Sequence, residues 1–559
     1  MPSLHKSEMS GTLRQATFQQ LRPICSVLLQ HRTSPEQLLS GLTNLHSQLG
    51  SIDAKGLKGC WDYVMFPLML IVDSIGPIRS QHKGTGLSPA DLDGGNHVDV
   101  PVPAARSDRV AEAALGCLQL MLERCECTDL DQRMEIMQRM MPMLVMLTQK
   151  DKGSPKRGSE KVMSLMHEEL TVLVLDCIGA LFPAHNDESD KAIVMKGVEV
   201  VDMLVGDSVV VPGSSDPPAA VDSVVVPGSS DPPAAVDSVV VPGSSDPPAA
   251  EAFLPAAGFM IHTCLEVAES QLLSTKASPK VRLSALRALK SVVEGLGAGG
   301  DRLAFFLPGL ASGLAKHLMP SASGSWTGQG AATGTGINSA CLVSALQCLM
   351  YAVHTTLGDD HALLLLHRDH LVQPHGVNPQ EQIIPLLQGK EEPLYTASTR
   401  NAGSTKERSL QVERTSSWIR ESGHRISGLL ARVLPPLCTH PNTTVRRVVA
   451  EGAVRLLQCC CSGGSSSALG ESGSRLMLET VLTLSLDDWR QVQQPCLQFM
   501  DGRSKGELAS SDNLDGSVTS FQKLLEDLLS DLPKAVRRGE EKALIASRRL
   551  AGAMMMAGE

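Results

Sequence analysis

Apolar residues recur along this chain at steps of three and four positions, the spacing that places side chains on one face of an α-helix. Residues 34–37, Ser-Pro-Glu-Gln, have the form of a capping box with proline at the first helical position, and leucines follow at 38, 42, 45 and 49. No alternating segments flank a hairpin signal, so the pattern predicts an all-α fold. Further helices are expected at 107–125, 129–144, 167–182, 251–273, 281–296, 302–318, 338–357, 419–434, 444–460, 474–486 and 520–532. The loop of about four residues after 107–125 predicts that this helix and the next form an antiparallel pair.

Two of these helices share a more specific pattern. In the first, Ser278 and a proline precede Val281-Arg282, and in the second His440-Pro441 precedes Val445-Arg446. Alanines and leucines follow each Val-Arg pair at helical spacing, as in the second helix of a HEAT repeat. Such repeats, of about 40 to 47 residues, stack into a superhelix, and we expect Arg282 to bridge to the neighbouring repeat. The sequence therefore predicts a HEAT/armadillo-like α-solenoid.

A tandem repeat interrupts the helices. The 15-residue unit Asp-Ser-Val-Val-Val-Pro-Gly-Ser-Ser-Asp-Pro-Pro-Ala-Ala-Val begins at Asp207, Asp222 and Asp237, and the three copies are identical except that Glu251 replaces the last valine of the third. Because proline and glycine disrupt helices and this period fits no solenoid repeat, we expect a disordered insertion. Transient strand pairing of the valine triplets is the alternative.

The helices and the long polar loops divide the chain. We expect N-terminal helices at 1–77, a linker at 78–105, helical repeats at 106–206 and the disordered tandem repeat at 207–250. HEAT-like helices follow at 251–320, a linker at 321–337, a helical segment at 338–387 and a linker at 388–415. More HEAT-like helices are expected at 416–500, a linker at 501–518 and a truncated helix pair at 519–559. Long loops between helices fit surface insertions of a solenoid.

Composition narrows the class of protein. Apolar residues make up 42% of the 559 residues and aromatic residues only 3%, which favours folded helices over sheets. The net charge is −10 and no long basic run occurs, so no nucleic-acid partner is expected. Neither a secretory signal nor an apolar run of about 18 residues, the length that spans a bilayer, is present. The 14 cysteines then indicate reduced core thiols in a soluble, intracellular protein.

Candidate chemistry is sparse. The glycines from Gly328 to Gly334 follow no buried strand, so a flexible linker is favoured over a dinucleotide loop. The segment that starts at Asp91 lacks the glycine and the glutamate of a calcium loop. His361, His367 and His370 form the densest titratable cluster, for which a solvated helix end is favoured over a metal site. The methionines from 134 to 146 are interpreted as core. We therefore expect no enzyme, no catalytic residue, no metal and no cofactor.

Several short segments, in order along the chain, resemble the Tti-one family of Tel-two-interacting proteins, HEAT-type scaffolds of the triple-T complex. The segment 62–68, Asp-Tyr-Val-Met-Phe-Pro-Leu, is similar to a family helix, as is the segment 302–309, Arg-Leu-Ala-Phe-Phe-Leu-Pro-Gly. The segment 414–418 and the later His-Pro and Val-Arg pairs, and the segment 532–552, are similar to further family motifs. The residues that carry the resemblance, taken as structural, are Tyr63, Phe66, Pro67, Leu68, Phe305, Phe306, Leu307, Pro308, Gly309, Trp418, His440, Pro441, Val445 and Arg446.

The resemblance implies a non-enzymatic scaffold of a cochaperone complex. Its implied partners are Tel-two-like and Tti-two-like HEAT proteins, the heat-shock-ninety chaperone system and the phosphatidylinositol-three-kinase-related kinases. These include the target-of-rapamycin and DNA-damage kinases, whose maturation the family supports. The implied location is the cytoplasm, with the nucleus as a second location. Family members are roughly twice as long, so the chain is expected to be an N-terminal half.

Two other function classes remain open at this point. One is a generic HEAT or armadillo adaptor in transport or trafficking, which has the same helical pattern but other partners. The other is an enzyme with its site around His361 to His370.

Overall fold

The computed structural model describes residues 2–30, 34–75, 107–125, 130–148, 168–182, 248–273, 278–297, 300–319, 338–372, 412–461, 467–504 and 514–557. In these ranges all regular secondary structure is helical, which confirms the expected all-α solenoid. Most of the tandem repeat and of the expected linkers lies outside them. The helices are α1 (Pro2–Gln30), α2 (Pro35–Ser51), α3 (Ala54–Gly59), α4 (Trp61–Ile75), α5 (Asp108–Cys125), α6 (Leu130–Thr148), α7 (Glu168–Leu181), α9 (Pro248–Leu273), α10 (Pro279–Leu296), α11 (Gly300–Leu318), α12 (Ser339–Leu357), α13 (Asp360–Val372), α14 (Ser416–Cys438), α15 (Thr443–Cys460), α16 (Gly470–Leu484), α17 (Arg490–Ser504), α18 (Leu514–Arg538) and α19 (Glu540–Ala557).

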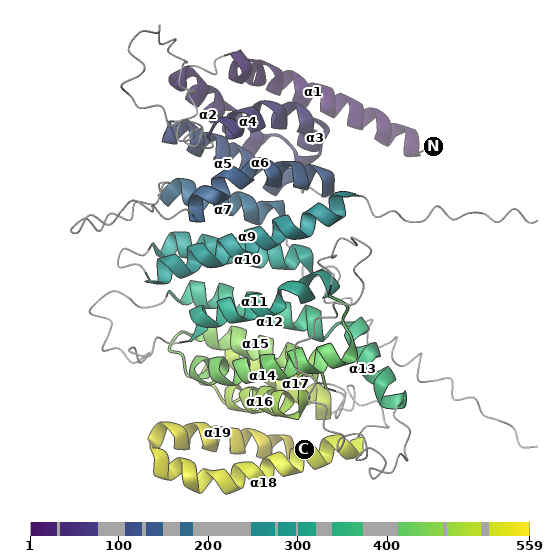
Figure 1. Cartoon of the computed structure of the whole chain (residues 1–559), viewed down its shortest axis with the longest axis vertical. Coiled ribbons are helices and arrows are strands. Elements are labelled where there is room, and N and C mark those ends of the chain that lie inside the picture. Colours follow the sequence, from purple (N-terminus) through teal and green to yellow (C-terminus); the bar gives the residue numbers. More distant parts are fainter. Residues whose placement is uncertain are drawn as a thin grey trace, which may run out of the picture.

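The helices stack in pairs along the long axis of the molecule, from α1 at one end to α18 and α19 at the other (Figure 1). One layer, which we call the second-helix layer, consists of α2, α5, α7, α10, α12, α15 and α17, each packed on the next. The first-helix layer consists of α1, α4, α6, α9, α11, α14 and α16. The last pair packs on α16 chiefly through α19. Each repeat therefore buries its apolar face against its neighbours, as in a solenoid.

The layer arrangement corrects the expected pairing of α5 with α6. Helix α5 packs mainly on α7, α2 and α4, whereas α6 packs mainly on α9 and α4. The short connection between α5 and α6 joins the second helix of one repeat to the first helix of the next. The expectation that α5 pairs with α6, which was based on the short loop between them, is therefore wrong.

Some helix bounds also differ from the expected ranges. Helix α17 was not expected, and it reaches Ser504, while α18 begins at Leu514. Helices thus occupy both ends of the range 501–518 that was expected as a linker. Helix α9 begins at Pro248, just inside the range given to the tandem repeat. Apolar residues in α17 are interleaved with glutamines, so its periodic signal is weak.

Side-chain caps define where several helices begin. The hydroxyl of Ser278 accepts a hydrogen bond from Val281 N at the start of α10, and Asn442 Oδ1 accepts one from Thr444 N at the start of α15. At α2 the expected capping box is wrong. Helix α2 does begin at Pro35, but the side chain of Ser34 makes no capping hydrogen bond. Proline at the first position, whose missing N–H costs nothing there, is the start signal that remains.

The core runs without interruption from α1 to α17, as one cluster of buried aliphatic, methionine and cysteine side chains. The leucines expected to line α2 are all buried, as are Met134, Met137, Met140 and Met143 of α6. Two cysteines form hydrogen bonds between neighbouring helices of the second-helix layer. The thiol of Cys117 on α5 donates to Leu42 O of α2 at 3.3 Å, and that of Cys177 on α7 donates to Leu115 O of α5 at 3.4 Å.

An ion pair joins the start of α15 to the turn between α16 and α17. Arg446 at the start of α15 donates from Nε and Nη2 to the two carboxylate oxygens of Asp487 at 2.7 and 3.0 Å. Its Nη1 donates to His440 O at 2.6 Å, and Asp487 Oδ1 also accepts from Trp489 N at 3.0 Å. Because Asp487 is only 4% exposed, breaking this pair leaves a buried charge without a partner.

Arg414 forms a second buried contact between repeats. Its side chain is 2% exposed and forms ion pairs with Asp301 of α11 and with Asp359, whose Oδ2 lies 2.8 Å from Nη1. It also donates to Thr356 O of α12 at 3.1 Å. Arg414 therefore fastens the segment before α14 to the preceding repeat.

Arg282 bridges to the neighbouring helix, as expected, but its partner is neutral. Its Nη2 lies 3.3 Å from Nδ1 of His317 on α11, and both side chains are buried. Burial, reinforced by the charge of Arg282, lowers the pKa of His317 to about 4. His317 is therefore neutral at physiological pH and accepts the hydrogen bond from the guanidinium.

Two glycines of α14 differ sharply in their surroundings. A Cβ atom at Gly423 would overlap the carbonyl oxygen of Ala468 and would lie only 2.8 Å from the carbonyl carbon of Ala468. A Cβ atom at Gly428, on the same helix, would meet nothing within 4 Å. Helix α14 thus approaches the backbone before α16 at Gly423.

We expect Gly423→Ala to lower the stability of this repeat by roughly 1–3 kcal/mol, since the new methyl group must push two backbones apart. Gly428→Ala should instead raise it by about 0.5–1 kcal/mol through helix propensity. Denaturation midpoints and hydrogen exchange in α14 measure both effects. Equal midpoints for the two variants would contradict the close backbone approach.

We expect Arg446→Met to destabilise α15 and α17 by roughly 3–5 kcal/mol, because Asp487 is left buried and charged. Combining it with Asp487→Asn should cost less than the sum of the two single changes. Hydrogen exchange in α15 and α17 provides the measurement. The neighbouring Arg447, which pairs with Glu451 at 3.5 Å on the surface, is the control, and Arg447→Met should change exchange little.

Acidification should weaken the contact between α10 and α11. The pKa of His317 falls from its ordinary 6.5 to about 4 in the folded chain. Between these values the unfolded chain binds a proton that the folded chain does not, so stability falls as pH falls, by on the order of 3 kcal/mol below pH 4. Denaturation midpoints between pH 7.5 and pH 4 should fall less in His317→Asn than in the wild type. His262→Asn, at an exposed position, should leave the wild-type slope unchanged.

Candidate functional site

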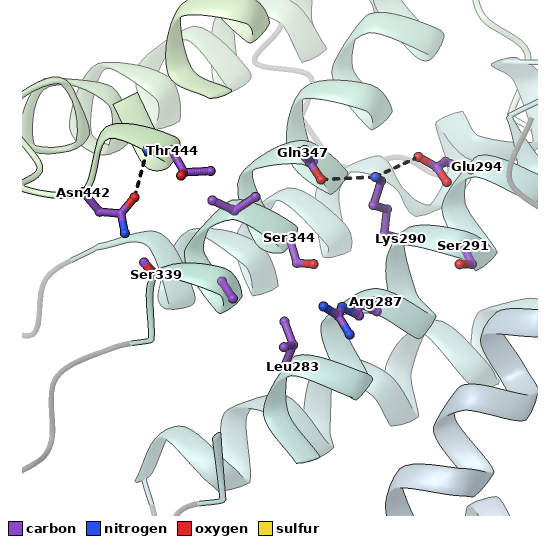
Figure 2. A pocket seen from close by; sticks show the side chains of 12 residues that line it. Leu283, Arg287, Lys290, Ser291, Glu294, Ser339, Ser344, Gln347, Asn442 and Thr444 are labelled. Atoms are coloured by element: carbon purple, nitrogen blue, oxygen red, sulfur yellow. Dashed lines mark hydrogen bonds and ion pairs between the residues drawn. The ribbon is translucent and has the colours of Figure 1, made fainter. Parts of the chain in front are cut away.

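A groove lies on the second-helix layer where three consecutive repeats meet. It has a volume of about 560 Å³ and lies between α10, α12 and the first turn of α15. Figure 2 shows its lining side chains converging from these helices. The lining residues are Leu283, Arg287, Lys290, Ser291, Glu294, Ser339, Ala340, Val343, Ser344, Gln347, Asn442 and Thr444.

Two cations of α10 line this groove, and they differ in their partners. Lys290 Nζ lies 3.5 Å from Oε1 of Glu294 and donates to Oε1 of Gln347 at 3.1 Å, the contacts drawn in Figure 2. Arg287 is exposed and makes no hydrogen bond or ion pair with any residue that the structure describes. Burial raises the pKa of Asp176 on α7, and the hydrogen bond from Ser284 and the charge of Arg287 offset part of this rise. The hydroxyl of Ser284 donates that hydrogen bond to Asp176 Oδ1 at 2.8 Å.

The other walls of the groove add no negative charge. Helix α12 contains no Asp, Glu, Lys or Arg from Ser339 to Leu357. Helices α12 and α15 both begin at the groove, and neither has an acidic residue in its first turn. The first turn of a helix carries a partial positive charge on its amide groups. Glu294, the acid of the groove lining, is paired with Lys290, so Arg287 gives the lining residues a net positive charge.

The residues that carry the family resemblance lie on different helices and form no common site. Tyr63 packs on Phe18, with ring centroids 4.6 Å apart, and Phe306 packs edge-on to Phe305 at 5.1 Å. The buried ones are Pro67, Leu68, Leu307, His440 and Val445, and the half-buried ones are Tyr63, Phe306, Trp418 and Arg446. The exposed ones are Phe66, Phe305, Pro308, Gly309 and Pro441.

Two of the exposed motif residues are aromatic. Phe66 on α4 is 60% exposed and Phe305 on α11 is 41% exposed, both on the first-helix layer. Isolated exposed aromatic side chains are common at protein contacts, although a single one does not define an interface. Among the motif residues, Arg446 has a clear structural role through its ion pair with Asp487. The exposed rings of Phe66 and Phe305 show no comparable structural role.

The titratable clusters do not assemble a catalytic or metal site among the described side chains. No group of three or more metal-ligating side chains is found there. His361 Nδ1 lies 3.4 Å from Arg414 Nη2, so this side chain supports the buried arginine. The side chains of His367 and His370, and the loops at 91–102 and 328–334, lie outside the described residues.

Every cysteine in the described ranges is a free thiol. Burial raises the pKa of Cys117 and of Cys496 to about 12, and it also raises that of Cys460. A thiol becomes a nucleophile or a metal ligand only as thiolate. These cysteines therefore serve packing, as the composition indicated.

One helix of the described chain, α12, is long and apolar enough to cross a membrane by length and composition. Two thirds of it, 67%, is buried inside the solenoid, where it packs on α10, α11 and α15. Core helices of this kind pass the same test, so α12 does not indicate a membrane span.

The groove was not found from the sequence. The inner stripe of α10 does place Arg287 on the opposite, exposed face of that helix. However, only the stacking brings Ser339 and Asn442, distant in sequence, beside it. The sequence feature that could have pointed to the groove is the lack of charged residues in α12.

Residues 248–488 match a family model described as the TTI1 N-terminal TPR domain. The comparison with curated proteins finds no match. The family description names the TPR type of repeat, where the sequence pattern indicated the HEAT type; both are solenoids of stacked helix pairs. The match covers α9 to α16, including the groove and the Arg446–Asp487 pair. It confirms the resemblance to the Tti-one family over residues 248–488, which match the helical-repeat domain of that family's N-terminal part.

Proposed function

We propose that this chain is a non-enzymatic scaffold in a Tel-two/Tti-type cochaperone complex that supports the maturation and stability of phosphatidylinositol-three-kinase-related kinases. The observation that carries the proposal is the match of residues 248–488 to the N-terminal domain of the family. A helical-repeat scaffold of this family is not a known enzyme class. The clients are the target-of-rapamycin and DNA-damage kinases.

The architecture supports a role in protein contacts. Stacked helix pairs present long continuous surfaces, and each repeat contacts only its neighbours. Burial raises the pKa of Cys117 and Cys496, and His361 contacts Arg414, so these groups serve the fold. The partners are Tel-two-like and Tti-two-like helical-repeat proteins and the heat-shock-ninety chaperone system, in the cytoplasm and the nucleus.

Affinity purification of the tagged gene product, with quantitative identification of bound proteins, tests the proposal. We expect Tel-two-like and Tti-two-like proteins and at least one kinase of this class to be enriched over a tag-only control. Depletion of the protein should lower the amounts of these kinases by roughly twofold or more at unchanged messenger RNA, since immature kinase is degraded.

The alternative, a transport or trafficking adaptor, predicts a different result. Recovery of transport receptors or coat proteins, with neither a Tel-two-like protein nor a kinase of this class, would contradict the proposed function. Unchanged kinase amounts after depletion would contradict the client assignment.

A further inference from the structure

Arg287 and Lys290 are the cations of the groove, and Lys290 is paired with Glu294. Three arginines of the described residues that have little exposed side chain all have partners: Arg446 pairs with Asp487, Arg414 with Asp301 and Asp359, and Arg282 with His317. Arg287 makes no hydrogen bond or ion pair with a described residue, and it lies in a groove whose acid is already paired. A guanidinium binds carboxylates with two parallel hydrogen bonds.

The rest of the groove offers both hydrogen-bonding and apolar contacts. Ser291, Ser339 and Thr444 provide hydroxyl groups, and Leu283 and Val343 provide apolar surface. The uncompensated first turns of α12 and α15 add partial positive charge. A ligand with alternating acidic and apolar side chains could contact the positively charged and the apolar residues of the groove at the same time.

The dimensions of the groove favour an extended segment over a helix. Its α10 wall runs from Leu283 to Glu294, which at about 1.5 Å per residue spans roughly 17 Å. An extended chain of about five residues covers that length. A helix of the same length, about 10 Å across with side chains, would occupy roughly twice the groove volume of about 560 Å³ or more.

We propose that the groove between α10, α12 and α15 binds an extended acidic segment of a partner protein, with a carboxylate of that segment paired to Arg287. The inference rests on the proposed scaffold function and names the chemistry of one contact surface. Lys290 positions the groove wall through Glu294 and Gln347, and it adds positive charge beside the bound segment.

Binding of defined peptides to the purified full chain tests this proposal. The probe is a fluorescein-labelled nonapeptide, Asp-Leu-Glu-Val-Glu-Leu-Asp-Val-Glu, followed by fluorescence anisotropy. We expect saturable binding that weakens as salt is raised, because surface charges are screened. Arg287→Glu should weaken binding roughly tenfold or more, and Arg287→Gln should give a smaller loss.

Two controls isolate the groove. Arg302→Glu places the same charge reversal at an exposed arginine of α11, on the first-helix layer, and should leave binding unchanged. A peptide with Asn and Gln in place of Asp and Glu should bind at least roughly tenfold more weakly to the wild type. Equal binding by Arg287→Glu and the wild type, or no binding of the acidic peptide to the wild type, would overturn the proposal.

A nucleic-acid occupant gives a separate result. If a single-stranded oligonucleotide bound more tightly than the acidic peptide and was equally sensitive to Arg287→Glu, the assignment to a protein segment would be overturned.

The purification experiment keeps this proposal separate from the proposed function. Failure of the peptide to bind, with Tel-two-like and Tti-two-like partners still recovered by the wild type, overturns the groove assignment alone. If the peptide binds in an Arg287-dependent way but these partners are not recovered, the proposed complex is overturned. The proposal that the groove binds an acidic segment is then still supported.

Discussion

The packing of each second helix on the next is the contact on which the rest of this structure depends. Helices α2, α5, α7, α10, α12, α15 and α17 bury aliphatic and cysteine side chains between them. Thiols small enough to touch a neighbouring carbonyl, as Cys117 and Cys177 do, allow these helices to approach closely. Because each repeat is stabilised mainly by its neighbours, the groove exists only while α10, α12 and α15 remain stacked.

Charged side chains add specificity to this apolar stack. A buried ion pair contributes little net stability compared with apolar packing, but leaving one partner unpaired is costly. The pairs of Arg446 with Asp487 and of Arg414 with Asp301 and Asp359 therefore penalise any shift of one repeat against the next. Arg287, on the exposed face of α10, forms no such pair with a described residue, and it lines the groove for which we propose an acidic segment.

The family motifs combine two kinds of residue. Pro67, Leu68, Leu307 and Val445 are buried, so they serve the packing of the solenoid. Phe66 and Phe305 are exposed on helices of the first-helix layer, whereas the groove is lined by helices of the second-helix layer. A scaffold needs both a rigid stack and surfaces that partners can reach, and the same short motifs contribute to each.

The sequence by itself determined the helices and their buried faces. Helical spacing identified the leucines of α2 and the stripe of α10, because a 3.6-residue period depends only on local geometry. It also indicated that Arg282 reaches a neighbouring repeat. Only the tertiary structure decided that α5 pairs with α4 rather than with α6, that His317 is the partner of Arg282, and that Ser339 and Asn442 lie beside Arg287. These are contacts between segments far apart in the chain, which the stacking of whole repeats brings together and no local pattern encodes.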